Sequence, residues 1–162
     1  MLKGKDPSLK IKYYLIGEGQ ETRNLKELVS NLHLQDSVVF VGACDYDTRN
    51  RYYKLSDVFI MPSIAQKNSI EGFGIVFLEA NFYKLPTIGS FSGGVVEAII
   101  DKKTGFLVKP DDLNDLVEKI LLIVKNKEYK LEMGEFGHKR VVNEFNWAQI
   151  INEYIKTFMS VL

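Results

Sequence analysis

The sequence has 162 residues, 46% of them hydrophobic, and its 21 Lys and Arg residues balance its 21 Asp and Glu residues. This length suits one domain with a proper core, and the absence of net charge argues against nucleic acid or an anionic membrane as a partner recognised by overall charge. The single cysteine, Cys44, excludes an intrachain disulfide, and no apolar run approaches the about 20 residues of a membrane-spanning helix.

Short apolar runs alternate with amphipathic segments along the whole chain, and they predict alternating strands and helices. In the first half we expect a strand over Ile11–Gly17, a helix over Glu21–Leu32, a strand over Val38–Val41, a helix over Thr48–Leu55 and a strand over Val58–Met61. The second half predicts a helix over Gly74–Tyr83, strands over Pro86–Gly89 and Gly105–Val108, and helices over Leu113–Val124, Lys130–Asn143 and Trp147–Met159.

Three details of these helices can be predicted. In the short helix over Thr48–Leu55 we expect Tyr52 and Leu55 to face inward. The helix over Leu113–Val124 has a clear apolar stripe, and Asp112 is its expected N-cap. The helix over Gly74–Tyr83 has Lys84 instead of a glycine after it, so it must end without a glycine C-cap.

Continuously apolar strands that alternate with helices indicate an α/β fold with a doubly wound parallel sheet. In such a fold, ligands bind beyond the carboxyl ends of the strands. The loops that follow the predicted strands are Gly17–Gly19, Gly42–Asp45, Pro62–Ser63 and Ser90–Gly94. We therefore expect a functional site where these loops gather.

The most informative segment is Glu71-Gly72-Phe73-Gly74 and the apolar run that leads to Glu79. The two carboxylates stand eight residues apart: the first precedes the predicted helix, and the second would point back along the same general face toward the helix start. The backbone N–H groups at the start of that helix could bind an anion, and the carboxylates could accept hydrogen bonds from sugar hydroxyls. The alternative is a buried helix with an acidic residue before its N-terminus.

Six segments, taken in order, resemble the C-terminal, nucleotide-sugar-binding domain of GT-B fold glycosyltransferases of family 4, the group 1 retaining transferases. They are Tyr14–Gly19, Val38–Gly42, Ser56–Ser63, Glu71–Ala80, Gly93–Glu97 and Thr104–Val108. The resemblance implies a Rossmann-like domain of about five strands over residues 1–162, with C-terminal helices over 126–162. It also implies that the family's first strand and helix, with their phosphate-binding Gly-Arg loop and Lys, are missing.

The resemblance implies roles for the matching residues. Glu71 would face the donor sugar and act in transfer, and Glu79 would hold the ribose hydroxyls. The backbone at Gly72, Phe73, Gly74 and Ile75 would meet the sugar or the diphosphate. The remaining substrate-binding positions implied are Gly17 and Gly19 near the donor, Gly42, Ala43 and Cys44 against the base, and Ser63. An ordinary strand-to-helix turn remains an alternative for Gly17–Gly19.

The implied activity is hexosyl transfer from a nucleoside diphosphate sugar, with retention at the anomeric carbon, in cell-surface polysaccharide or glycolipid synthesis. The family needs no divalent metal, so we expect no cofactor and no metal ligands. The expected partners are the nucleotide sugar and a missing N-terminal acceptor-binding domain, without which the chain would be inactive. We expect no nucleic acid and no membrane contact from this segment, and a homodimer could form through an exposed sheet edge.

Two alternatives stay open at this point. The chain could be a non-catalytic subunit that completes a split glycosyltransferase, or a fragment of a nucleotide-sugar epimerase or phosphorylase with the same fold. A lone cysteine favours a reducing compartment. We therefore expect a cytoplasmic location, at the inner face of the membrane in a full-length enzyme.

Overall fold

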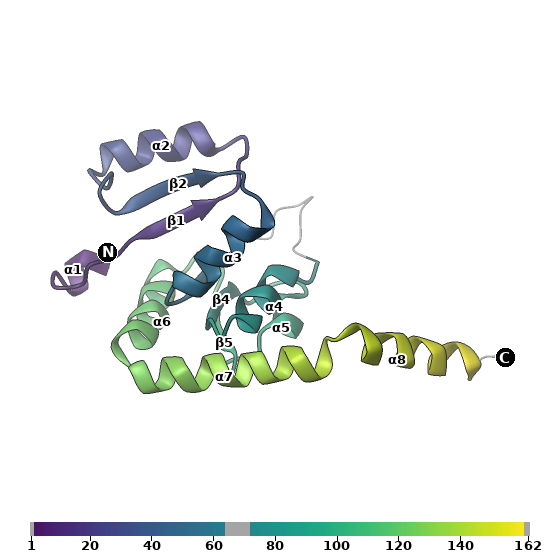
Figure 1. The fold of residues 1–162 in the computed structure, drawn as a ribbon. Coiled ribbons are helices and arrows are strands. Elements are labelled where there is room, and N and C mark those ends of the chain that lie inside the picture. Colours follow the sequence, from purple (N-terminus) through teal and green to yellow (C-terminus); the bar gives the residue numbers. More distant parts are fainter. Residues whose placement is uncertain (1, 64–71, 161–162) are drawn as a thin grey trace. The chain divides into compact units, whose positions relative to one another are not determined.

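The computed structural model describes residues 2–63 and 72–160 of the chain (Figure 1). Up to the first gap its elements are α1 (Leu2–Lys5), β1 (Tyr13–Ile16), α2 (Thr22–Asn31), β2 (Val38–Gly42), α3 (Tyr46–Leu55) and β3 (Phe59–Met61). After the gap they are α4 (Ile75–Phe82), β4 (Thr87–Ser90), α5 (Val95–Ala98), β5 (Gly105–Val108), α6 (Leu113–Lys125), α7 (Lys127–Glu144) and α8 (Trp147–Met159). The predicted α/β alternation is confirmed, and the short helix α5 is additional.

All strand pairs in the two sheets of the described chain are parallel, as predicted. β1 pairs with β2 in one sheet, and β3, β4 and β5 form the other in that order. The chain divides into two compact units, Met1–Tyr52 and Tyr53–Leu162, so each sheet belongs to one unit. No helix in residues 2–63 or 72–160 is long and apolar enough to cross a membrane.

The first unit is a small, open assembly of β1, β2 and α2. The β1–β2 ladder aligns Tyr13 with Val38 and shifts register after Leu15. Lys26 of α2 lies over the ring of Phe40 in β2, 5.6 Å from its centroid. The predicted α2 leucines Leu25, Leu28 and Leu32 remain 41–56% exposed, because a two-stranded sheet offers too little surface to cover a helix.

The core of the second unit forms around the β3–β4–β5 sheet and α4. One cluster consists of Phe77, Val95, Ala98 and Ile99, all essentially inaccessible to solvent. A second consists of Tyr53, Ala80 and Leu85. α4 therefore has almost no polar face: it is the central helix of this unit and is fixed in place by packing on both sides.

α7 packs against α4 through two glycines. A Cβ added at Gly134 would lie 2.2 Å from the carbonyl oxygen of Lys84, and one at Gly137 would lie 2.8 Å from Cγ of Asn81. Such contacts are possible only where α7 has no side chain. Figure 1 shows α8 continuing beyond the end of α7.

Two of the detailed predictions are confirmed, and the third is wrong for one of its two residues. Asp112 caps α6 by accepting hydrogen bonds from the amides of Asn114 and Asp115, both at 3.0 Å. α4 ends without a glycine: Lys84 itself adopts the left-handed conformation, with φ of 60°. Tyr52 is half-buried, with its ring centroid 5.1 Å from that of Tyr14. Leu55 does not face inward, since it is 82% exposed, and the buried residue of α3 is Tyr53. The helix is rotated so that Tyr53, the neighbour of Tyr52, points into the second unit's core.

Candidate functional site

The Gly-Phe-Gly segment leads into α4 through a backbone turn that requires glycine. Gly74 is the N-cap of α4, with φ of 76° and ψ of 59°, and its carbonyl accepts a hydrogen bond from the amide of Phe77 at 2.9 Å. The left-handed region costs a residue with a Cβ about 1–2 kcal/mol. The next amides, of Ile75 and Val76, lie in the first turn of α4, where an α-helix supplies no acceptor of its own.

A pocket of ≈ 360 Å³ opens at this helix N-terminus. Its lining residues are Met61 at the end of β3, and Phe73, Gly74, Ile75 and Val76. The start of α4 thus lies at the carboxyl end of a parallel strand, the position at which open α/β sheets bind ligands. Of the predicted substrate-binding residues, Phe73, Gly74 and Ile75 line this pocket.

A second glycine loop supports the first. A Cβ added at Gly94, the N-cap of α5, would lie 1.7 Å from the carbonyl oxygen of Gly72. At the other end of α5, the guanidinium of Arg140 donates to the carbonyl oxygens of Ala98 and Glu97, at 2.6 and 2.8 Å. The loops after β3 and β4 are therefore in direct backbone contact, and α7 holds α5 against them.

Phe73 also contacts the C-terminal helices. Its ring centroid lies 6.0 Å from that of Phe145, the C-cap of α7, with the rings tilted by 46°. The guanidinium of Arg140 lies over the ring of Phe145, 4.9 Å from its centroid. The end of α7 thus braces the Gly-Phe-Gly segment.

Glu79 projects from the second turn of α4, where it is half-buried. The hydroxyl of Tyr53 donates a hydrogen bond to its Oε2 at 3.1 Å. Tyr53 is 6% exposed and comes from α3. Tyr53 is the site residue that sequence reasoning missed.

Two predicted site positions have less structural support. Glu71, the predicted catalytic residue, lies outside the described residues. Ser63 is described, and its amide donates to the carbonyl oxygen of Met61 at 3.0 Å, in a tight turn after β3.

In the first unit, the Gly17–Gly19 loop meets the end of β2. The amide of Gly17 donates to the carbonyl oxygen of Gly42 at 2.8 Å. Gly42 has φ of 78°, and a Cβ there would lie 3.0 Å from Oε1 of Glu18. Gly17 and Gly42 therefore lie side by side where β1 and β2 end, and Gly19 belongs to the turn that leads into α2.

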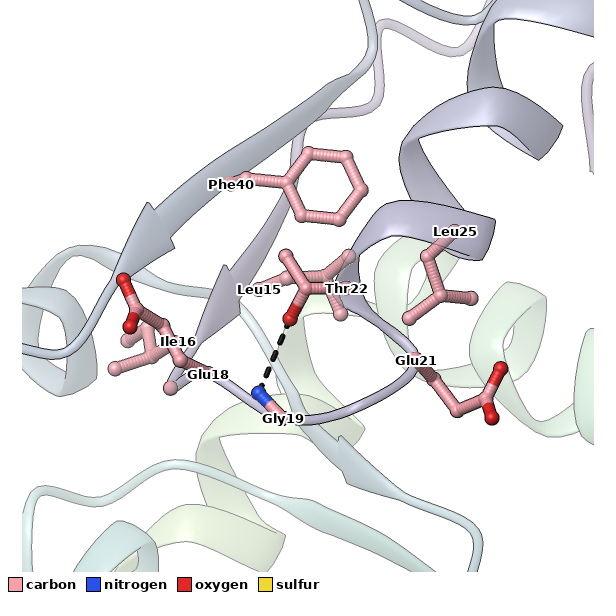
Figure 2. Close-up of a pocket in the computed structure, with 9 residues that line it drawn as sticks. Leu15, Ile16, Glu18, Gly19, Glu21, Thr22, Leu25 and Phe40 are labelled. Carbon is pink, nitrogen blue, oxygen red and sulfur yellow. Dashed lines mark hydrogen bonds between the residues drawn. The ribbon is translucent and has the colours of Figure 1, made fainter.

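A pocket of ≈ 230 Å³ is lined by Gly17, Glu18 and Gly19 of this loop (Figure 2). Its other lining residues include the apolar Leu15, Leu25 and Phe40. The amide of Gly19 donates to Oγ1 of Thr22 at 3.1 Å, which closes the turn into α2.

The loop after β2 continues through Ala43 and Cys44 to the start of α3. Asp45 caps this helix by accepting a hydrogen bond from the amide of Thr48 at 2.8 Å. Hydrogen bonds from the side chain and the backbone of Thr48 hold the pKa of Asp45 below its usual value.

The sequence contains one Asp-x-Asp pattern at Asp45 and Asp47. The structure uses Asp45 as a helix cap. Among residues 2–63 and 72–160, no group of three or more His, Cys, Asp or Glu side chains is placed to hold a metal ion.

Comparison with known proteins identifies relatives of this chain. Residues 3–140 match the family model described as glycosyl transferases group 1. The chain is 31% identical over 151 residues, 93% of its length, to N-acetyl-alpha-D-glucosaminyl L-malate synthase of Bacillus anthracis, of which it covers 38%.

Solved structures share the fold. The sucrose-phosphate synthase of Thermosynechococcus elongatus superposes with a TM-score of 0.82 and 28% identity, over 99% of this chain and 41% of that one. The Anabaena protein HepE, crystallised with UDP, has a TM-score of 0.79 and 24% identity over 94% of this chain and 41% of that one. The chain thus spans about two-fifths of the length of each of these relatives.

Proposed function

The chain belongs to the glycosyl transferases group 1 family, and from that membership we propose that it binds a nucleoside diphosphate sugar, the donor for a retaining sugar transfer. The observation that carries the proposal is the arrangement on α4. Its glycine-capped N-terminus opens into a pocket, and Glu79 lies further along the same helix, held by Tyr53. An anion-binding end and a diol-binding carboxylate on one rigid helix suit a ligand that has both diphosphate and sugar hydroxyls.

The proposed roles follow from the chemistry of each group. Glu79 accepts hydrogen bonds from the ribose hydroxyls, because a carboxylate can accept from both hydroxyls of a vicinal diol. The amides of Ile75 and Val76 stabilise the negative charge that grows on the leaving diphosphate as its bond to the anomeric carbon breaks. The family resemblance further assigns a role in transfer to Glu71, and donor-binding roles to Gly17, Gly19 and the loop from Gly42 through Cys44.

HepE was crystallised with UDP, which supports a nucleotide as the ligand of this fold. Because the chain covers 38% of the Bacillus anthracis relative, the acceptor site of the complete enzyme is proposed to lie in polypeptide outside residues 1–162. We also propose that binding needs no divalent cation, since helix N-terminal amides can take that role.

Calorimetric titration with UDP, GDP and ADP, with and without Mg²⁺, tests the proposal. One nucleotide should bind, and Glu79→Ala should weaken it about tenfold or more, or ~1.4 kcal/mol. Glu132→Ala is the matched control, because Glu132 is an exposed glutamate on α7. Binding that is the same in all three proteins, or that is absent for every nucleotide, contradicts the proposal.

A further inference from the structure

The phenol of Tyr53 is fixed in place by its neighbours. Its ring stacks on that of Tyr83, with centroids 5.7 Å apart and planes 17° from parallel. The ring of Phe59 meets it edge-on at 5.8 Å and 64°. With 6% of Tyr53 exposed, the ring has one position, and its hydroxyl oxygen therefore has a defined place next to α4.

This hydroxyl contacts the carboxylate that the proposed function assigns to the ribose. The donor comes from α3 and the acceptor from α4, 26 residues apart in sequence, and their separation is 3.1 Å. A glutamate side chain on a helix surface normally samples several rotamers. A bond from an immobile phenol selects the rotamers that keep Oε2 beside Tyr53.

We infer that Tyr53 is a positioning residue, which orients the Glu79 carboxylate so that it can accept both hydroxyls of a ribonucleotide at once. The inference rests on the proposed function. A carboxylate offers about four acceptor positions, so the bond from Tyr53 is compatible with simultaneous bonds from two ligand hydroxyls. Groups that hold a binding residue in its productive geometry raise affinity by reducing the ordering that binding requires.

If Tyr53 orients Glu79, the chain should prefer ribonucleotides to 2′-deoxynucleotides. A purely structural role of Tyr53 in stabilising the fold predicts no such preference. An oriented carboxylate discriminates a ribonucleotide from its 2′-deoxy form, because only the former supplies both hydroxyls in the expected geometry. A carboxylate that moves between rotamers distinguishes the two less well. Tyr53 thus contributes to the recognition of the ribose through Glu79, without itself contacting the ligand.

The test uses Tyr53→Phe, which keeps the ring and its packing and removes only the hydroxyl. Tyr83→Phe is the matched control, since it removes a hydroxyl from the stacked neighbour. Each protein is titrated by calorimetry with UDP, GDP and ADP and with their 2′-deoxy forms. Tyr53→Phe should bind the preferred ribonucleotide about three- to tenfold more weakly and should have a lower ratio of ribonucleotide to 2′-deoxynucleotide affinity. Tyr83→Phe should change neither the affinity nor the ratio.

A double-mutant cycle provides the second readout. If Tyr53 acts through Glu79, adding Tyr53→Phe to Glu79→Ala should cause no further loss of affinity. An equal fall in affinity for the ribo and deoxy forms, or a full additional loss in the Glu79→Ala background, overturns the inference.

The inference and the proposed function fail differently. Wild-type affinity in Tyr53→Phe together with weak binding by Glu79→Ala overturns the role of Tyr53 and leaves nucleotide binding intact. Unchanged binding by Glu79→Ala, or no binding by the wild-type chain, overturns the proposed function and the inference with it.

Discussion

Gly94 and Gly72 are in backbone contact: a Cβ on Gly94 would lie 1.7 Å from the carbonyl oxygen of Gly72. The two glycines belong to the loops that follow β4 and β3, and the second of these loops leads into the α4 pocket. The position of the Gly-Phe-Gly segment therefore depends on the absence of a side chain in a different loop. This dependence makes Gly94 a structural requirement of the site.

Gly94→Ala should displace the Gly72 segment and destabilise the chain, because backbone cannot yield as a flexible side chain can. We expect a loss of about 1–3 kcal/mol in the free energy of unfolding, measured by urea denaturation. Gly19→Ala is the control: a Cβ there has no atom within 4 Å, and its loss should stay within about 0.5 kcal/mol. Equal urea midpoints for Gly94→Ala and the wild type would contradict the contact.

Asn81 is fully buried and connects the end of α4 to the strand that follows it. Its Nδ2 donates to the carbonyl oxygens of Leu85 and Thr104, at 2.9 and 3.2 Å. Asn81→Ala removes this donor from the Leu85 oxygen, whereas the Thr104 oxygen still accepts from the amide and the hydroxyl of Thr87, so the change should cost about 1–3 kcal/mol. Urea denaturation measures the loss, and Asn152→Ala, on the exposed surface of α8, should change little. A similar midpoint for the two variants would show that water replaces the amide.

The ion pair between Lys84 and Glu135 links the end of α4 to α7 at 2.5 Å. The hydrogen bond from Lys84 holds the pKa of Glu135 below its usual value. Because the folded-state pKa is lowered, the stabilisation is complete above the pKa of an unperturbed glutamate, about 4.3, and disappears as the pH falls through the lowered pKa.

Urea midpoints of the wild type and Glu135→Gln, measured from about pH 7 to about pH 3, test this sign. The wild type should be the more stable at neutral pH, and the two midpoints should converge in acid. Glu132→Gln on the same helix should show no such convergence. A difference that stays constant over the whole range would mean that Glu135 acts through packing rather than charge.

Trp147, the only tryptophan in the sequence, begins α8 and is 79% exposed. Apolar side chains along the same helix are exposed too, among them Ile151, Tyr154 and Phe158. At low protein concentration, the fluorescence of Trp147 should therefore have the emission maximum of tryptophan in water, and acrylamide should quench it freely. A blue-shifted, protected emission at every dilution would mean that α8 packs against something in the isolated chain.

Local sequence patterns predicted the strands well. Gly105–Val108 was placed at its observed bounds, and the other predicted strands differ from the observed ones by a few residues at their ends. Apolar runs bounded by glycine or proline carry this information, because strand and turn preferences act between neighbours in the chain. The glycine-dependent start of α4 was predicted for the same reason, and the pocket beside it follows from the parallel-sheet rule.

The short helix α3 marks the limit of such reasoning. Its helical character could be predicted, but its rotation could not, and Leu55 proved exposed while Tyr53 was buried. A helix with a weak apolar stripe has no orientation of its own; the surrounding core selects one.

The sequence alone determined the order of helices and strands, the family, and the motif that includes Gly74 and Glu79, because these depend on residues close together in the chain. Only the tertiary structure decided that Tyr53 donates to Glu79 and that Gly94 touches Gly72. These contacts join residues on different elements, and they form where the packing of whole helices and loops brings the elements within hydrogen-bond or van der Waals distance. Local residue preferences along the chain do not encode these contacts between distant elements.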